Sequence, residues 1–333
     1  MYTPGNILVT GGAGFTGSHF VNKLIDHYKN QNKVVVVDRL DYPSLVENWT
    51  PQTLESKRFS FEKVDICDKL QMYLILSRNK IDTVLHFAAQ THVDHSFTNS
   101  DQFIKDNILG THNLLQACKE WGGIKRFLHV STDEVYGEVP FDQKEGCKEN
   151  YPLYPTNPYA ATKAGAEFIA WSFMKSFGIP IVMTRCNNIY GWGQYPDKII
   201  PKFATLLANG EKLSIHGRGT AKRNFIHVSD VTNACIVLLE KGKIGETYNI
   251  GTSNEFSVME IAEQMVKLFH GVDAKVSSFI EYVPDRNFND CRYHVNAEKL
   301  VALGWREIKP FAIGFRETVD WYRQKLRKAI TKT

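Results

Sequence analysis

The chain has few cysteines, and their spacing excludes two common uses of that residue. Six cysteines occur in 333 residues, and no two of them stand in a Cys-x-x-Cys pair. They are Cys67, Cys118, Cys147, Cys186, Cys235 and Cys291. This spacing argues against a zinc site and against a compact disulfide framework, so we expect no metal. Scattered thiols are typical of cytosolic proteins, and we therefore expect a cytoplasmic location.

Long hydrophobic runs and a strong net charge are also lacking. No apolar run approaches the length that crosses a bilayer, so we expect no membrane partner. No basic segment with a long apolar segment precedes the first strand, so we expect no signal peptide. The net charge of +4 is small and spread out, which argues against a nucleic-acid partner. The chain length and a hydrophobic content of 43% predict a globular protein with one large domain and a smaller lobe.

Three glycines follow a short apolar strand near the N-terminus. The strand spans residues 6–10, and Gly11, Gly14 and Gly17 come directly after it, with Phe15 inside the same loop. Glycine permits a tight turn and a close backbone approach to a pyrophosphate. The helix that follows offers free N–H groups and a positive dipole end to the phosphates. This order of strand, glycine turn and helix predicts a dinucleotide-binding loop.

An acidic residue ends the next apolar strand. That strand covers residues 34–37 and stops at Asp38, 21 residues after Gly17. A dinucleotide-binding fold places at this point the acid that bonds the adenosine ribose hydroxyls. A carboxylate there repels a 2′-phosphate, which favours NAD over NADP. Arg39 weakens this inference, because an arginine could accept that phosphate.

Two more apolar strands are predicted, at residues 59–64 and 83–87. Asp65 and Ile66 follow the first of them and are candidates to contact adenine, although a plain turn would also explain them. Ala88 and Ala89 follow the second strand, where small residues let the backbone lie close to a ligand. The histidines just beyond lack a regular metal-ligand frame, so we interpret them as loop residues facing solvent or substrate.

Two adjacent carboxylates stand at the end of a further buried strand, at residues 126–130. Thr132, Asp133 and Glu134 follow this strand. Burial desolvates such a pair, and each carboxyl raises the pKa of the other. Such a pair does not stabilise a hydrophobic core, whereas proton transfer can make use of it. The alternative is a solvated acidic turn.

A tyrosine and a lysine stand four residues apart at the start of a predicted helix. Tyr159 and Lys163 follow Pro158 and would share one helix face. A lysine ammonium beside a phenol lowers the pKa of the phenol toward neutrality and makes it a general base. An exposed polar pair is the alternative. The polar, proline-containing segment 138–158 before this helix is typical of a lid or binding loop.

Alternation of strands and helices predicts the fold class. With helices expected at 100–121 and 159–177, the pattern indicates an α/β fold with a Rossmann-type doubly wound parallel sheet. Ligands of such sheets lie at the carboxyl ends of the strands, where Gly11, Asp38 and Thr132 should converge. We predict a cofactor-binding domain with the catalytic residues over 1–190, and a smaller C-terminal α/β substrate-binding lobe over 191–333.

The C-terminal lobe carries basic candidates for phosphate binding. Arg223 precedes an apolar strand and could bind a phosphate in bidentate fashion. A second polar cluster contains Arg286, Asp290, Arg292 and Tyr293.

These motifs resemble the extended short-chain dehydrogenase/reductase family over essentially the whole chain. Within it, the sequence is similar to the nucleotide-diphosphate-glucose 4,6-dehydratases. The resemblance is carried by the three glycines, Asp38, Asn188 and residues 65–66, 88–94, 131–137, 155–163, 196–202 and 286–293. Thr132-Asp133-Glu134 is the specific part, because related sugar-nucleotide epimerases usually lack the acid pair.

The resemblance implies a three-stage reaction that uses NAD. Tyr159, assisted by Lys163, takes the proton of the sugar 4-hydroxyl while hydride leaves C4, and Thr132 bonds the same oxygen. Glu134 then removes the C5 proton, and protonated Asp133 donates to the departing C6 hydroxyl. The hydride returns to C6, which gives a 4-keto-6-deoxy sugar nucleotide, the first step toward a deoxysugar such as rhamnose. One carboxyl must therefore be neutral while the other is charged.

The resemblance also implies contacts with the nucleotide-diphosphate sugar, the expected partner. Arg223 and Arg292 meet the diphosphate, with Asn188 and Lys198 nearby. The other substrate candidates are Thr91, His92 and Asp290. The Asn187-Asn188 pair and residues 288–290 look more like plant UDP-glucose enzymes than bacterial dTDP-glucose enzymes. UDP-glucose is therefore preferred, and dTDP-glucose stays open.

Two other functions compete with this interpretation. A sugar-nucleotide 4-epimerase would need the tyrosine and lysine but no acid pair. A catalytically silent NAD-binding regulator would need neither. The family usually forms homodimers through the helices at 100–121 and 159–177, so a homodimer is expected.

Overall fold

A seven-stranded sheet forms the centre of the larger domain. The computed structural model describes residues 1–28, 32–285 and 288–330. The strand order is β10-β6-β5-β4-β1-β2-β3, and every neighbouring pair is parallel. The strands are β1 (Asn6–Thr10), β2 (Val34–Asp38), β3 (Phe59–Lys63), β4 (Ile81–His86), β5 (Arg126–Thr132), β6 (Ile181–Cys186) and β10 (Thr247–Ile250). The predicted Rossmann-type doubly wound sheet is confirmed.

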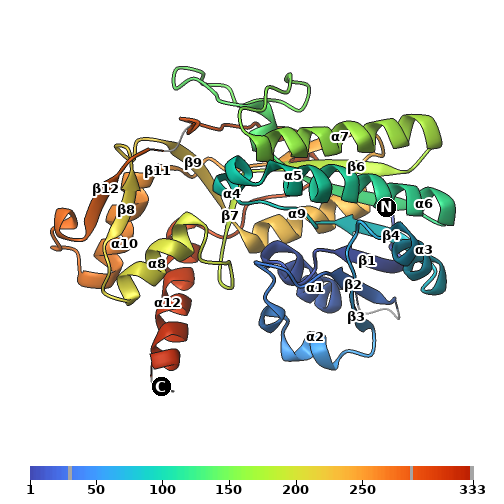
Figure 1. The fold of residues 1–333 in the computed structure, drawn as a ribbon, viewed down its shortest axis with the longest axis horizontal. Helices are drawn as coiled ribbons and strands as arrows, with labels where there is room; N and C mark the ends of the chain where they lie inside the picture. Colours follow the sequence, from blue (N-terminus) through green and yellow to red (C-terminus); the bar gives the residue numbers. More distant parts are fainter. Residues whose placement is uncertain (29–31, 286–287, 331–333) are drawn as a thin grey trace.

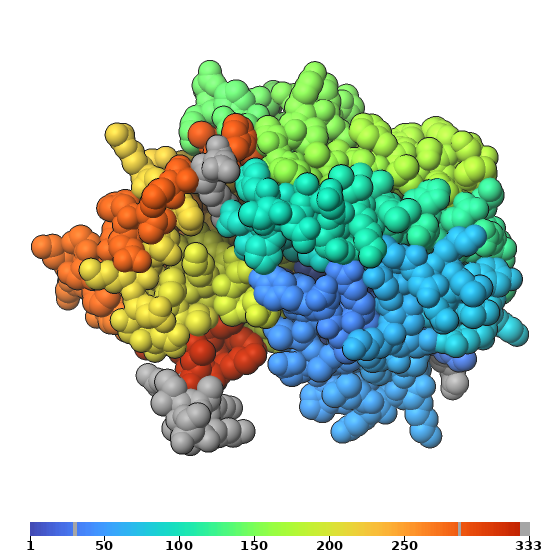
Figure 2. Space-filling view, in the orientation of Figure 1, coloured from blue at the N-terminus to red at the C-terminus, as the bar shows by residue number. Residues whose placement is uncertain are grey.

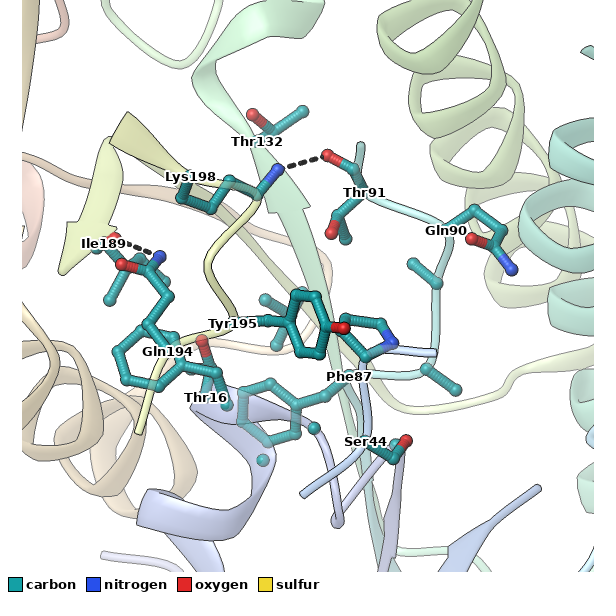
Figure 3. A pocket seen from close by; sticks show the side chains of 18 of the residues that line it. Thr16, Ser44, Phe87, Gln90, Thr91, Thr132, Ile189, Gln194, Tyr195 and Lys198 are labelled. Atoms are coloured by element: carbon teal, nitrogen blue, oxygen red, sulfur yellow. Dashed lines mark hydrogen bonds between the residues drawn. The ribbon is translucent and has the colours of Figure 1, made fainter. Parts of the chain in front are cut away.

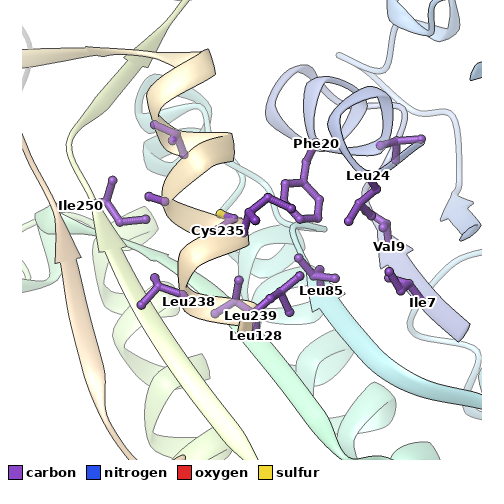
Figure 4. Close-up of a cluster of buried hydrophobic side chains, with 14 of the residues drawn as sticks. Ile7, Val9, Phe20, Leu24, Leu85, Leu128, Cys235, Leu238, Leu239 and Ile250 are labelled. Carbon is purple, nitrogen blue, oxygen red and sulfur yellow. The ribbon is translucent and has the colours of Figure 1, made fainter. Parts of the chain in front are cut away.

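Helices cover both faces of this sheet (Figure 1). One layer holds α1 (Phe15–His27) and α9 (Val228–Lys241), and the other holds α3 (Lys69–Arg78), α6 (Gly110–Trp121) and α7 (Pro158–Phe177). Side chains of a strand alternate between the two layers. In β1, Ile7 and Val9 pack in the α1/α9 cluster, while Leu8 packs with the other layer. Figure 4 shows the first cluster, in which Phe20 of α1 meets Cys235 of α9.

The helix predicted over 100–121 is present but irregular. It consists of α5 (Ser100–Phe103), a π-helical turn over Ile104–Leu109, and α6. Such turns are rare and often lie at functional sites. The sequence patterns did not predict α2 (Pro51–Glu55), α3 or α4 (Val93–Thr98). His92, placed in a loop by the sequence, caps α4 by accepting a hydrogen bond from the His95 N–H at 3.2 Å.

The smaller lobe has its own sheets and core. A three-stranded sheet joins β7 (Asn188–Tyr190), β9 (Lys222–His227) and β11 (Glu255–Ser257), and β8 (Leu213–His216) pairs with β12 (Ile280–Val283). Their helices are α8 (Ile199–Ala208), α10 (Val258–His270) and α12 (Phe311–Ile330). The core contains Phe203, Ile261 and Phe315. In Figure 2 this yellow-to-orange lobe lies against the blue and green larger domain.

The chain returns to the large domain after it has entered the smaller lobe. Helix α9 packs on α1, and β10 pairs with β6 at the edge of the seven-stranded sheet. Helix α11 (Glu298–Ala302) packs next to β10. The chain first leaves the seven-stranded sheet after Cys186, because β7 already belongs to the three-stranded sheet, and part of the segment 191–333 packs with the larger domain.

A buried ion pair ties α7 to β6. The Glu167 carboxylate accepts hydrogen bonds from Arg185 at 3.1 Å from Nε and 2.7 Å from Nη2, and both side chains are buried. Glu167→Ala would leave the guanidinium buried without its partner. We expect this variant to lose about 3–5 kcal/mol of unfolding free energy, measured by urea denaturation.

Glu263→Ala, an exposed change on α10, is the control and should have little effect. Replacing both charged partners by apolar residues of similar size, in Glu167→Leu with Arg185→Met, should recover much of the loss. Equal stability of Glu167→Ala and the parent protein would contradict the assignment.

Candidate active site

A cleft of about 330 Å³ lies at the carboxyl ends of the central strands, where the smaller lobe meets the sheet (Figure 3). Most of the predicted site residues line it: Gly11, Gly14, Phe15, Gly17, Asp38, Arg39, Asp65, Ile66, Ala88, Ala89, Thr91, Thr132, Asp133, Glu134, Tyr159, Lys163, Asn188 and Lys198. They come from elements on both sides of the domain junction, so the fold brings them into one space.

The glycine loop packs closely against the protein backbone because side chains are missing. Gly11 has a φ of +67°, and a Cβ there would lie 2.6 Å from the Ala88 nitrogen. A Cβ at Gly17 would lie 2.1 Å from the Gly11 carbonyl oxygen. Helix α1 starts at Phe15, and its N-cap residue Gly14 makes no side-chain hydrogen bond. This uncapped helix start beside a closely packed turn fits the pyrophosphate of a dinucleotide.

Asp38 lies beside this loop with its carboxylate fixed by the protein. One oxygen accepts from the Ala13 N–H at 3.0 Å, and the other accepts from the Leu40 N–H and Ser44 Oγ, both at 2.8 Å. The side chain lines the cleft at the end of β2. Its position fits contact with ribose hydroxyls.

The surroundings of Asp133 raise the pKa of its carboxyl toward neutral pH. It begins a short 3-10 turn directly after β5, and its Oδ2 accepts a hydrogen bond from Asn187 Nδ2 at 2.7 Å. Burial and the nearby Glu134 carboxylate raise the pKa of Asp133 to about 7, although the Asn187 bond acts against this. Thr132 caps the turn by accepting from the Glu134 N–H at 3.3 Å.

Glu134 lies in the same space with a different set of partners. Its Oε2 accepts from Asn157 Nδ2 and from Tyr293 Oη, each at 3.2 Å. Burial raises the pKa of Glu134, and the positive charge of Arg223 acts in the opposite direction. The two acids therefore meet different neighbours within one cleft, which is the arrangement needed for one to donate and one to accept a proton.

Tyr159 and Lys163 share a face of α7 and are both buried. Lys163 Nζ donates to the Val130 carbonyl at 2.7 Å, and burial lowers the pKa of Lys163 to about 8, against the effect of Glu167. The sequence predicted a lowered pKa for the Tyr159 phenol. The protein groups around it have the opposite effect, so this prediction was wrong. Burial, and after it the Glu134 carboxylate, raises the pKa of Tyr159.

On the substrate side, the smaller lobe contributes charges and hydroxyls. Lys198 Nζ donates to the Thr91 carbonyl at 2.6 Å, as Figure 3 shows. The Arg223 guanidinium lies 4.6 Å from the centre of the Tyr293 ring. Asp290 is buried and accepts from Thr156 Oγ1 at 2.7 Å and from the Tyr293 hydroxyl. A chain of contacts thus joins Arg223 and Asp290 to Glu134 through Tyr293.

Four predicted substrate contacts are not among the residues that line the cleft: His92, Arg223, Asp290 and Arg292. Arg292 Nε donates to Glu255 at 2.6 Å, and its Nη1 donates to the carbonyls of Pro140 and Gln143 at 3.2 and 2.9 Å. Its guanidinium therefore braces the segment after β5, and a role in diphosphate binding stays a prediction. His92 caps α4 and is not among the residues that line the cleft. Arg286 lies outside the described residues.

Sequence reasoning missed several side chains that organise the site. Asn157 caps α7 by accepting from the Ala160 N–H at 2.8 Å, in addition to its bond with Glu134. An asparagine before a proline at a helix start is a recognisable N-cap signal. Asn187 was noted only for its resemblance, and Asp106 in the π-helical turn was not noted, because nothing local in the sequence indicates their partners.

Two absences can be stated for the described part of the chain. There, no group of three or more His, Cys, Asp or Glu side chains could hold a metal ion. No helix in residues 1–28, 32–285 and 288–330 has the length and hydropathy to pass through a bilayer.

Known proteins match this chain over nearly its whole length. The family described as GDP-mannose 4,6 dehydratase matches residues 8–318. An Arabidopsis thaliana protein named trifunctional UDP-glucose 4,6-dehydratase/UDP-4-keto-6-deoxy-D-glucose 3,5-epimerase/UDP-4-keto-L-rhamnose-reductase is 50% identical over 97% of this chain. Only 48% of that relative's length is covered, so the chain spans about half of it.

Two further relatives are covered almost completely. The human dTDP-D-glucose 4,6-dehydratase is 43% identical over 96% of this chain and 90% of its own length. The structure of DesIV, a dTDP-glucose 4,6-dehydratase from Streptomyces venezuelae solved with NAD and TYD bound, has a TM-score of 0.91 and 36% identity, and 97% of this chain and 98% of that chain are covered. We conclude that this chain belongs to the GDP-mannose 4,6 dehydratase family of extended short-chain dehydrogenases/reductases.

Proposed function

We propose that the protein is an NAD-dependent nucleotide-sugar 4,6-dehydratase that converts UDP-glucose to its 4-keto-6-deoxy derivative, on the way to a deoxysugar such as rhamnose. The observation that carries the proposal is the acid pair, buried Asp133 and half-buried Glu134, in one cleft with Tyr159 and Lys163. UDP-glucose is preferred over dTDP-glucose because the relative named for UDP-glucose is 50% identical and the human relative named for dTDP-glucose is 43% identical.

Oxidation at C4 needs a base and a hydride acceptor. When bound, NAD supplies the acceptor, and its nicotinamide cation adds the positive charge that the Tyr159 phenolate needs. Tyr159 takes the proton of the sugar 4-hydroxyl. The Thr132 hydroxyl, at the end of β5, holds the same oxygen. Lys163 is anchored on the Val130 carbonyl and keeps a positive charge within the buried wall behind the tyrosine.

Loss of water uses the two carboxyls in opposite states. The 4-ketone makes the C5 proton acidic, and Glu134 as carboxylate removes it. The C6–O bond then breaks as protonated Asp133 gives its proton to the departing hydroxyl, which leaves as water. The Asn187 amide holds the Asp133 carboxyl in place at 2.7 Å. After hydride returns to C6, Glu134 gives its proton back to C5. Tyr159 releases the proton of the 4-hydroxyl to solvent, and Asp133 is reprotonated from solvent, which restores all three groups.

The protonation of Asp133 predicts the alkaline limb of the pH profile. Since its pKa is raised to about 7, the donor form is lost as the pH rises through that value. The Lys163 ammonium is lost at higher pH, because its pKa is lowered to about 8. At acid pH, protonation of Glu134 removes the base. We therefore expect a bell-shaped rate of product formation whose alkaline limb begins near neutrality, measured as turnover between about pH 5.5 and 9.

In Asp133→Asn this first alkaline step should disappear, and the remaining slow reaction should fall only as Lys163 deprotonates. A profile that is flat across neutrality in the parent protein would contradict the role of Asp133 as the acid.

The experiment that tests the proposed function is a side-by-side assay of UDP-glucose and dTDP-glucose with NAD. Product formation is followed by the alkaline absorbance of the 4-keto sugar and by mass spectrometry, which detects loss of one water. We expect faster conversion of UDP-glucose. Formation of UDP-galactose would show a 4-epimerase, and unchanged nucleotide sugar after long incubation would show a silent NAD-binding regulator.

The proposal includes a homodimer in the cytoplasm. Several large apolar side chains are exposed on the helical segment 100–121 and on α7: Ile104, Leu109, Phe168 and Phe177. Burial of these side chains against a second copy would remove apolar area from water. All six cysteines are free thiols, which supports a reducing compartment. Sedimentation equilibrium should report twice the mass of the chain.

A further inference from the structure

An arginine lies where a dinucleotide fold distinguishes its two cofactors. Arg39 directly follows Asp38 at the end of β2 and lines the cleft. In such folds an acid at this point bonds the ribose 2′-hydroxyl of NAD, while an arginine nearby can accommodate the 2′-phosphate of NADP. The two neighbouring residues therefore favour opposite cofactors, and the outcome depends on what the guanidinium can reach.

The Asp106 carboxylate accepts hydrogen bonds from the guanidinium of Arg39. The two make a bidentate pair, with Nη1 to Oδ1 at 2.9 Å and Nη2 to Oδ2 at 2.6 Å. The exposed fraction of the side chain is 7% for Asp106 and 26% for Arg39. This fork-to-fork geometry is the one by which arginine binds a planar oxyanion, so the hydrogen-bonding edge that a phosphate would use is taken.

The Asp106 carboxylate is itself held in place. Gln90 Nε2 donates to it at 3.0 Å and Gln102 Nε2 at 2.8 Å. Burial acts to raise the pKa of Asp106, but hydrogen bonds from Arg39, Gln102 and Gln90 outweigh it and hold that pKa below its usual value. The group is therefore a carboxylate at neutral pH. Its two glutamine partners come from the segment after β4 and from α5.

The π-helical turn over Ile104–Leu109 supports this placement. Asn107, the next residue, accepts from the Gln90 N–H at 2.7 Å and donates to the Gln90 carbonyl at 3.1 Å and to Thr162 Oγ1 at 3.0 Å. Two adjacent side chains of one turn thus fix Gln90 and Arg39 from the same wall. The segment that carries Asp106 is locked to both α7 and the cleft edge.

Further carboxylates surround the same guanidinium. Asp41 Oδ2 lies 3.0 Å from Nη2, and Asp65 Oδ2 lies 3.4 Å from Nη1. With Asp106, three carboxylates face this single positive charge. A 2′-phosphate would add close to two negative charges in a region that already carries an excess of them.

We propose that Asp106 is a specificity-determining residue: by holding Arg39 in a bidentate pair, it withholds the arginine from a ribose 2′-phosphate and makes the cleft accept NAD and reject NADP. The inference rests on the proposed use of NAD and deepens it, because it names the residue that decides between the two cofactors.

The test is calorimetric titration of nucleotide-free protein with NAD and with NADP. Asp106→Asn keeps the shape of the side chain, but its NH2 group replaces one carboxylate oxygen, which releases one half of the Arg39 pair and one of the two glutamine contacts. We expect this variant to bind NADP at least about tenfold more tightly than the parent protein, with its NAD affinity changed less than about threefold. Adding Arg39→Gln to Asp106→Asn should abolish the gain, because the freed guanidinium is the group that binds the phosphate.

Asp41→Asn is the matched control. Asp41 also pairs with Arg39 but is exposed, and its loss leaves the Asp106 pair intact. It removes the same charge near the 2′ position and should change NADP affinity less than about threefold. A gain as large as that of Asp106→Asn would show that net charge decides the selectivity, and it would overturn the proposal.

The remaining outcomes distinguish a failure of the proposal on Asp106 from a failure of the proposed use of NAD. If Asp106→Asn binds NAD like the parent protein and still binds NADP as weakly, the proposal on Asp106 fails while the use of NAD stands. If the parent protein binds NADP rather than NAD, the proposed cofactor fails and this inference with it. Should Asp106→Asn fail to fold, Arg39→Gln in the parent background decides, since the clamped arginine should not contribute to the residual NADP binding. A loss of that binding would overturn the proposal.

Discussion

Tyr159→Phe is expected to stop hydride transfer from the sugar, lowering its rate by about a hundredfold to ten-thousandfold, the usual contribution of a positioned acid–base group. The variant loses only the hydroxyl that takes the proton of the 4-hydroxyl. The ring, which is buried and packs edge-to-face at 6.4 Å from the Phe103 ring, is retained. The fold and the cofactor site should therefore be unaffected.

The measurement for this variant is a single turnover with saturating UDP-glucose, followed by the absorbance of reduced nicotinamide. The parent protein should show a transient signal, and Tyr159→Phe should show none on the same timescale. Calorimetric titration with NAD provides the control, because binding should persist. Transient reduction at the parental rate would rule out Tyr159 as the base.

The double variant Asp133→Asn with Glu134→Gln is expected to fail at the second stage. Oxidation at C4 does not need the acid pair, whereas C5 deprotonation and departure of the C6 hydroxyl each need one of its members. Both replacements keep side-chain size and can still bond to Asn187 and Asn157. We expect reduced nicotinamide to form and persist, with the release of water slowed by about a thousandfold or more.

This result is distinguishable from that of Tyr159→Phe, since one variant accumulates the reduced cofactor and the other never forms it. A matched control with the same charge change, Asp101→Asn with Glu281→Gln, lies on exposed positions and should turn over like the parent protein. Normal water loss in the acid-pair variant would show that other groups carry out the elimination.

The sheet could be predicted from the sequence because each of its central strands is a nearly continuous apolar run. Strand β2 is buried along its whole length, and its four consecutive valines leave no other interpretation. Helix α3 was not predicted, because polar residues interrupt its apolar stripe. The return of β10 to the large sheet could not be predicted, since strand sequence does not specify which sheet edge it will join.

In the site too, residues in local sequence motifs could be predicted, and partners that are distant in the sequence could not. The glycine loop, the acid pair and the Tyr159–Lys163 pair are local patterns, and the structure places all of them in one cleft. The partners Asn187 and Asp106 act across separations of 54 and 67 residues, so no spacing rule points to them. The contacts of Arg292 with Glu255 and backbone carbonyls could not be predicted from its place beside a substrate motif, because these partners also lie far away in the sequence.

The prediction of a lowered pKa for the Tyr159 phenol was wrong for a related reason. From the sequence, the only evident partner of Tyr159 was Lys163, four residues further along the same helix. In the fold, the tyrosine is buried near the carboxylates of Asp133 and Glu134, which lie in the turn that follows β5. Burial and these charges dominate over the single local partner, which could be known only once β5 and α7 were brought together.

The late position of β10 has a consequence for how the chain is made. Ribosomal synthesis delivers the N-terminal strands first, and β6 then has a free edge until Thr247 emerges, after much of the smaller lobe has been translated. An open strand edge invites pairing with other chains. Nascent polypeptides halted between β6 and β10 should therefore engage chaperones and be sensitive to proteases, and protection should rise sharply when β10 docks.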